Sequence, residues 1–124
     1  MNIDYRAWDT SGVIIVCDGR KFVVAPEDLV LPDNKKTQAG LFEQSQAKEI
    51  NRNLASGWSI PTHEQMLEMV KICKGMKNGR SYWTDNANDA YNPTSERSVP
   101  RMDIEQEMVL CRIRCVCDLV SAME

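Results

Sequence analysis

Three of the five cysteines lie close together in the stretch "CRIRCVC". Cys111, Cys115 and Cys117 have the spacing C-x3-C-x-C, which places all three side chains on one side of an extended strand because strand side chains alternate. Three thiolates on one face are suited to metal or redox chemistry, although the C-x2-C spacing typical of zinc sites is missing and His63 is the sole histidine. We expect buried free thiols that pack as small apolar side chains, with a metal or redox site as the alternative.

The polar stretch "DNANDAYNPTSE" resembles a calcium-binding loop in the spacing of its acids. Asp85, Asp89 and Glu96 occupy the first, fifth and twelfth places of an EF-hand loop, but Ala87 stands at the third place and Ala90 at the sixth, where the turn needs glycine. We therefore expect no metal here and interpret the stretch as a polar loop. No Ser/His/Asp set and no glycine-rich phosphate loop occurs, so the sequence predicts a protein without catalytic residues or cofactor.

The charge balance argues against a nucleic-acid binder. The chain of 124 residues has a net charge of −3, whereas proteins that bind nucleic acid normally carry a basic excess. Lys71, Lys74, Lys77 and Arg80 do cluster, but they follow an expected helix, and cations are favourable at a helix C-terminus. We interpret this cluster as a helix end within a single domain spanning residues 1–124.

No targeting or membrane segment is evident in the sequence. The N-terminal "MNIDYRAWDT" lacks the apolar core of a signal peptide, and the apolar run "GVIIVC" is far too short to span a bilayer. An odd number of cysteines indicates free thiols in a reducing compartment. These features predict a soluble protein of a bacterial cytoplasm or a phage particle, with no membrane partner.

The hydrophobic pattern predicts a hairpin and then two helices. Strands over 13–17 and 21–25 flank an Asp-Gly turn at residues 18–20, and a surface loop is expected over 29–40. A helix over about 42–55 is predicted by apolar residues at helical spacing, namely Ala47, Ile50 and Leu54. A second helix over about 63–75 begins with a capping box of Thr62 and Gln65.

The remainder of the chain predicts a short strand, a loop and a long strand. The stretch "RSYWTD" reads as a short aromatic strand, 85–102 as a long polar loop, and 105–120 as a terminal strand. In that last strand one face would carry Leu110, Arg112, Arg114 and Val116, and the other Cys111, Ile113, Cys115 and Cys117.

Several motifs resemble a bacterial family of small domains related to the C-type lectin fold. The family includes the domain of unknown function 1566 and the Fibrobacter major paralogous domain. "GWSIPT" is similar to its G-W-x-L-P-T motif, "YWT" to Y-W-S-S, "IRCV" to V-R-C-V, and "CDGRKFVVAPEDL" to its N-terminal segment. Ile60 and Asp85 depart from the pattern, and the loop before the last strand is shorter, so the resemblance implies no particular ligand.

The resemblance implies an α+β, C-type-lectin-like fold. Two helices would pack on a small mixed or antiparallel sheet, with the N- and C-terminal strands close together and a long polar loop outside. Trp58, Pro61, Thr62 and Trp83 would be structural: Trp58 would fill the core, Pro61 would fix the chain and Thr62 would cap the second helix. An exposed Trp58 that stacks on a sugar or peptide is the alternative.

These features predict a non-enzymatic binding module that presents the 85–102 loop to a macromolecular partner, a protein in the first place and a glycan as the alternative. Tyr91, Arg97 and Arg101 are residue types favoured in contact hot spots, and Asp85 and Asp89 lie in the same loop. A structural component, such as a phage particle protein that packs against its own copies, is the alternative. The oligomeric state is left open.

Overall fold

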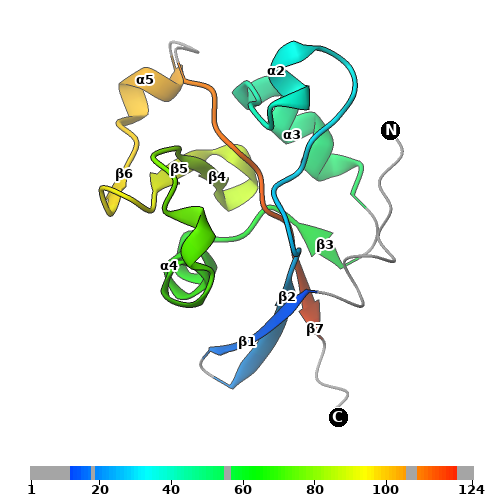
Figure 1. Ribbon diagram of the computed structural model, residues 1–124, viewed down its shortest axis with the longest axis vertical. Coiled ribbons are helices and arrows are strands. Elements are labelled where there is room, and N and C mark those ends of the chain that lie inside the picture. The colour runs from blue at the N-terminus through cyan, green and yellow to red at the C-terminus, as the bar shows by residue number, and fades with distance from the viewer. Residues whose placement is uncertain (1–11, 18, 55–56, 106–108, 120–124) are drawn as a thin grey trace.

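The structure is a computed structural model, and it describes residues 12–17, 19–54, 57–105 and 109–119. Four helices accompany two antiparallel sheets in this part of the chain, which makes it a small α+β arrangement (Figure 1). None of these helices is both long enough and apolar enough to cross a lipid bilayer.

The larger sheet brings the two ends of the described chain together. Its strand order is β1-β2-β7-β3, with bounds Val13–Cys17, Arg20–Val24, Val116–Leu119 and Trp58–Ser59. The predicted hairpin is confirmed, with Ile15 opposite Phe22 and Gly19 at φ +77° in the turn. β7 pairs antiparallel with β2, so the early and late strands are neighbours, as expected.

Successive side chains along these strands point to opposite faces of the sheet and pack into two separate cores. Phe22 and Val24 lie on the face with Ile15, against the buried Met66 and Met69 of α4 (His63–Ile72). Val23, one residue out of phase, belongs to the second core, together with Trp58, the buried residues of α3 (Gln44–Arg52) and most of the other apolar side chains. The sheet therefore has a different helix on each face.

Both predicted helices are present but shorter than expected. α4 begins at the predicted capping box, in which Thr62 Oγ1 accepts from Gln65 N at 3.1 Å and Gln65 Oε1 accepts from Thr62 N at 2.9 Å. It ends at Ile72 because Cys73 leaves the helical region with ψ 76°, and a 3-10 turn, η1 (Lys74–Met76), follows.

The segment 29–40 contains a short helix that the expected loop did not include. α2 (Lys35–Gln38) is fixed by a capping box between Asn34 and Thr37, in which Asn34 Oδ1 accepts from Thr37 N at 3.0 Å. The buried Thr37 hydroxyl also donates to Leu31 O at 3.0 Å, which ties the helix back to the preceding chain.

The predicted terminal strand is longer than the strand in the structure, but the predicted alternation of its side chains between two faces agrees with their burial. Residues 106–108 and 120 of the predicted strand lie outside the described part, and within the rest β7 is the only strand. The residues before β7 bond in turn to different neighbours: Cys111 N to Phe42 O, Arg112 N to Ser81 O, and Ala25 N to Cys115 O. Because the partners change, no single ladder forms. Cys111, Ile113 and Cys115 nevertheless share one core, while Val116 belongs to the other.

The polar segment 85–102 is structured, which corrects the expected loop. It contains a 3-10 turn η2 (Asp85–Ala87), strand β5 (Asp89–Asn92), strand β6 (Arg97–Ser98) and the start of α5 (Arg101–Glu105). With β4 (Tyr82–Thr84) the two strands form a second sheet in the order β4-β5-β6. In Figure 1 this sheet lies to the left of α2 and α3, and α3 is bonded to the turn η2 between β4 and β5.

Candidate binding surface

β4 anchors the segment 85–102 to the core. Trp83 is fully buried, and its indole Nε1 donates to Phe42 O at 3.0 Å. Its backbone N donates to Arg112 O at 2.9 Å, so both the ring and the main chain are fixed. A buried tryptophan with its N–H satisfied is a strong anchor, in line with the structural role expected for Trp83.

The residues directly after β4 turn in the left-handed sense. Asp85, Asn86 and Ala87 have φ of 52°, 59° and 68°, a conformation that costs roughly 1–2 kcal/mol for each L-residue. Asp85 N donates to Pro61 O at 2.9 Å, and Asp85 Oδ1 accepts from His63 N at 3.0 Å. Asp85, expected at the binding site, is thus a cap on the first turn of α4 supplied from a distant part of the chain.

Helix α3 holds the other side of this turn. Gln44 Nε2 donates to Ala87 O at 2.9 Å, and Asn51 Nδ2 donates to Asn86 Oδ1 at 3.1 Å. Asn51 also accepts from Ile60 N at 2.8 Å through its other side-chain atom, so it bridges two loops. These bonds over-determine the turn, which is the condition under which a strained backbone persists.

A tight turn joins β5 to β6. Asn92 Oδ1 accepts from Thr94 N at 2.8 Å and from Ser95 N at 3.1 Å, and Glu96 N donates to Asn92 O at 2.8 Å. Glu96 has φ 57°, a conformation that glycine usually provides in hairpin turns of this kind. A glutamate at this position lowers local stability and places a charged side chain on the exposed turn.

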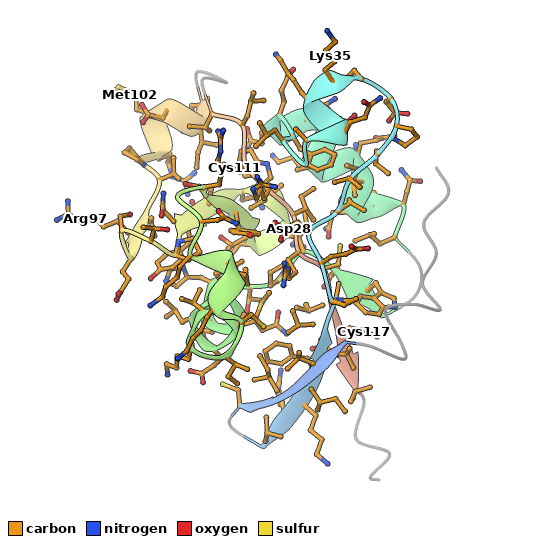
Figure 2. All side chains as sticks on the ribbon, in the orientation of Figure 1. Asp28, Lys35, Arg97, Met102, Cys111 and Cys117 are labelled. Atoms are coloured by element: carbon orange, nitrogen blue, oxygen red, sulfur yellow. The ribbon has the colours of Figure 1, made fainter. Side chains whose placement is uncertain are left out.

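The structure separates the residues that the sequence grouped as contacts. Tyr91 is 6% exposed, and the centroids of its ring and the His63 ring are 5.4 Å apart in a T-shaped arrangement, so Tyr91 belongs to the core and not to the presented surface. Asp89 and Arg101 form an exposed ion pair at 3.4 Å. Arg97 points away from the molecule, and Met102 beyond it is 66% exposed (Figure 2).

Trp58 and Pro61 lie where the resemblance implied. Trp58 is 7% exposed and packs in the core that contains Trp83, and Pro61 is buried as well. The alternative of an exposed, ligand-stacking Trp58 is contradicted by this burial.

The C-terminal cysteines lie in an environment that disfavours thiolates. Burial raises the pKa of the Cys111 thiol to about 12, and that of Cys115 also to about 12. Metal ligation and thiol exchange need the thiolate, which burial disfavours at Cys111 and Cys115. Among the described residues no three His, Cys, Asp or Glu side chains are grouped as metal ligands would be.

A hollow of about 500 Å³ lies beside the start of α4, lined by Cys17, Arg20, Phe22, Thr62, Gln65 and Asp118 among others. Gln65 Nε2 donates to Asp118 Oδ1 at 3.1 Å. Two polar side chains that line the hollow are therefore bonded to one another, which leaves fewer polar groups in the hollow to bind a ligand.

A charged cluster that the sequence analysis missed links the two sheets. Asp28 Oδ1 accepts from Arg114 Nε at 2.9 Å, and Asp28 Oδ2 accepts from the Tyr82 hydroxyl at 2.9 Å and lies 3.6 Å from Arg112 Nη1. Burial and the nearby Asp28 carboxylate raise the pKa of Tyr82 to about 12. Arg112 and Arg114 were placed on one face by their alternation with the cysteines, but no spacing in the sequence pairs either arginine with Asp28.

Comparison with protein-family models, with curated proteins and with solved structures finds no match for this chain.

Proposed function

We propose that the protein is a non-enzymatic binding module that recognises a macromolecular partner, a protein rather than a glycan, through the surface of residues 85–102. The observation that carries this proposal is the distribution of backbone strain. Within the described residues, four positions other than glycine have positive φ, and all four lie in this segment: Asp85, Asn86, Ala87 and Glu96. Strained conformations held by their surroundings cluster at functional sites, where they fix a surface in advance of binding.

The exposed side chains of this segment have the chemistry of a protein interface. Arg97 and Met102 are exposed, and Arg101 is held only by a solvent-exposed ion pair. Arginine and methionine are enriched at protein interfaces, and arginine is frequent among hot-spot residues. The buried Tyr91 supports the strand from below instead of touching the partner.

The arrangement of potential catalytic groups supports a binding role over an enzymatic one. The sole histidine, His63, packs its ring against Tyr91. Burial raises the pKa of Cys111 and Cys115 and so holds both side chains as thiols. A nucleophile needs an adjacent base or a lowered pKa, and the raised pKa values of Cys111 and Cys115 oppose the second route.

A C-type-lectin-like relationship remains part of the proposal. It is supported by the neighbouring early and late strands β2 and β7 and by a second small sheet that carries the segment 85–102.

Site-specific cross-linking tests the proposal. A photo-reactive amino acid at Ser98, on the exposed strand β6, is expected to capture one defined species from a bacterial lysate. The same group at the exposed Lys36 of α2 is the matched control and is expected to capture nothing of that size. Changing Arg97, Arg101 and Met102 together to alanine should abolish the product while altering the free energy of unfolding by no more than about 0.5 kcal/mol for each change. Equal capture at both positions, or capture that survives the triple change, would contradict the proposal.

The second candidate is a structural component that assembles with its own copies, and the edge strand β1 favours it. Ile14 and Val16 are 59% and 61% exposed on a strand whose five residues include no charge and no proline. Such edges readily pair with another chain. Light scattering distinguishes the candidates, because a closed oligomer that dissociates on Val16→Lys would favour assembly, whereas a monomer would favour the binding module.

A further inference from the structure

A run of basic residues follows α4, and the structure changes its interpretation. The sequence suggested a helix C-terminus, but α4 ends at Ile72, so Lys74, Lys77 and Arg80 lie in η1 and the loop after it. No acidic residue occurs between Glu68 and Asp85. Their position beyond the last helical turn weakens the helix dipole as an explanation, since its effect falls off within that turn.

The basic loop is bonded to the β5–β6 turn of the proposed binding surface. Gly79 N donates to Thr94 Oγ1 at 2.8 Å, and Asn92 Nδ2 donates to Gly79 O at 3.4 Å. Arg97 is the register partner of Asn92 on the neighbouring strand. The loop that carries the lysines and the hairpin that carries Arg97 are therefore adjacent.

The loop itself has a fixed conformation. Asn78 Oδ1 accepts from Arg80 N at 3.0 Å, and Asn78 Nδ2 donates to the Tyr82 hydroxyl at 3.1 Å. These bonds place the loop against β4, so the cations project from a backbone that is already ordered.

The charges on this face are not compensated. Lys74, Lys77, Arg80 and Arg97 are all exposed, and none has an ion-pair partner within the described part of the chain. Some other exposed cations do have such partners, for example Lys71 with Glu68 and Arg52 with Glu49. On a protein of net charge −3, an uncompensated cluster of this sign creates a local positive field.

We propose that Lys74, Lys77, Arg80 and Arg97 form one basic face that binds an acidic segment of a protein partner. The inference rests on the proposed function and names the chemistry of the partner. An acidic peptide fits better than a nucleic acid, because the negative charge of the whole molecule opposes a long polyanion. No aromatic side chain is among the exposed large hydrophobic residues of the described chain, so bases have no stacking platform there.

Fluorescence anisotropy with defined probes tests the inference. A labelled poly-glutamate peptide of about ten residues is expected to bind at low salt and to be released as the salt screens the charges at about 300 mM. The triple change Lys74→Glu, Lys77→Glu and Arg80→Glu should weaken binding of the peptide by at least about tenfold. The same triple change combined with Arg97→Glu should also weaken it by at least about tenfold relative to the unchanged protein. The triple change Lys21→Glu, Lys35→Glu and Lys36→Glu alters the net charge equally at exposed sites elsewhere, and it should weaken binding less than about twofold.

Three outcomes would overturn the inference. They are no binding of poly-glutamate at low salt, equal weakening by both triple changes, and tighter binding of a single-stranded DNA oligonucleotide of matched charge than of poly-glutamate. If the charge reversal lowers the melting temperature, the changes Lys74→Gln, Lys77→Gln and Arg80→Gln are used in its place. The same loss of binding is expected from them. Each of these failures leaves the cross-link at Ser98 unaffected, so a failed inference is distinguishable from a failed function.

Discussion

At the scale of single residues, burial assigns the aromatic side chains to their roles. Trp58 and Trp83 share one core, while Tyr82 and Tyr91 belong to the other. Trp83 and Tyr82 are consecutive on β4, so one short strand supplies the largest fully buried side chain of each core. Trp58, Trp83 and Tyr82 therefore contribute their side chains to the two cores of the fold.

Truncation of Trp58 is expected to be severe. Trp58→Ala removes a side chain that is 7% exposed and leaves a cavity, so it should cost about 3–5 kcal/mol. Urea unfolding followed by circular dichroism measures this loss. Met102→Ala, at a position 66% exposed, is the control and should change the free energy of unfolding by less than about 0.5 kcal/mol. Native-like unfolding of Trp58→Ala would refute its role in the core.

The buried thiols predict a loss of stability in alkali. The pKa of Cys111 and Cys115 lies near 9 in the unfolded chain and is raised to about 12 by burial. Below pH 9 both states are protonated, and above it the unfolded state releases protons first, so stability falls as the pH rises toward 12. Between pH 8 and about pH 10 each thiol should lower the free energy of unfolding by an amount on the order of 1 kcal/mol. When both cysteines are changed to alanine, the free energy of unfolding should therefore depend less steeply on pH. A slope unchanged by the double replacement would show that these thiols ionise freely in the folded state.

At the scale of elements, the β5–β6 hairpin shows a conflict between residue type and backbone conformation. Glu96 has a left-handed conformation on an exposed turn, and its side chain makes no ion pair with another described residue. No ion pair of the Glu96 side chain with another described residue therefore accounts for the strain of its backbone.

Glycine at this position should stabilise the protein. Glu96→Gly removes the Cβ that opposes φ 57°, and the gain should be roughly 0.5–1 kcal/mol after the entropy of glycine is counted. Glu96→Ala keeps the Cβ and should give no gain, so the difference between the two variants in urea unfolding isolates the backbone effect. Identical midpoints for glycine and alanine would show that the turn is unstrained.

The sequence was informative where the determinants are local. The start of α4 followed from Thr62 and Gln65, which are three residues apart and bond to one another. β5 was missed because its two apolar residues, Ala90 and Tyr91, are adjacent and show no alternation. Its pairing is set instead by β4, whose position depends on bonds to Phe42 and Arg112 far along the chain.

At the scale of the whole molecule, Asp28 connects segments that are distant in sequence. Asp28 and Arg114 are 86 residues apart and bonded at 2.9 Å, and both are nearly buried. No periodicity or spacing relates two such residues, so this part of the structure was outside the reach of sequence patterns. The same holds for the basic face, whose loop and hairpin meet only after folding.

Neutralising Asp28 should destabilise the fold. Asp28→Asn leaves Arg112 and Arg114, with side chains 24% and 14% exposed, without their counter-charge, at a cost of about 2–4 kcal/mol. Asp33→Asn, at an exposed position with no ion pair to a described residue, is the control and should be nearly neutral. Thermal and urea unfolding measure both variants, and equal behaviour of the two would mean that the cluster contributes nothing to stability.

The pairing of β2 with β7 also has a consequence for synthesis of the chain on the ribosome. Lys21 lies opposite Leu119, so the strand that joins β2 to β3 in the larger sheet is among the last parts of the described chain to be translated. Until β7 has emerged, β2 has one free edge and Trp58 lacks its strand partner Cys117. Exposed strand edges and apolar surface are hazards for aggregation, and contacts between distant residues form slowly. The nascent protein therefore has a long interval in which its hairpin and "GWSIPT" segment are available to chaperones before the sheet closes.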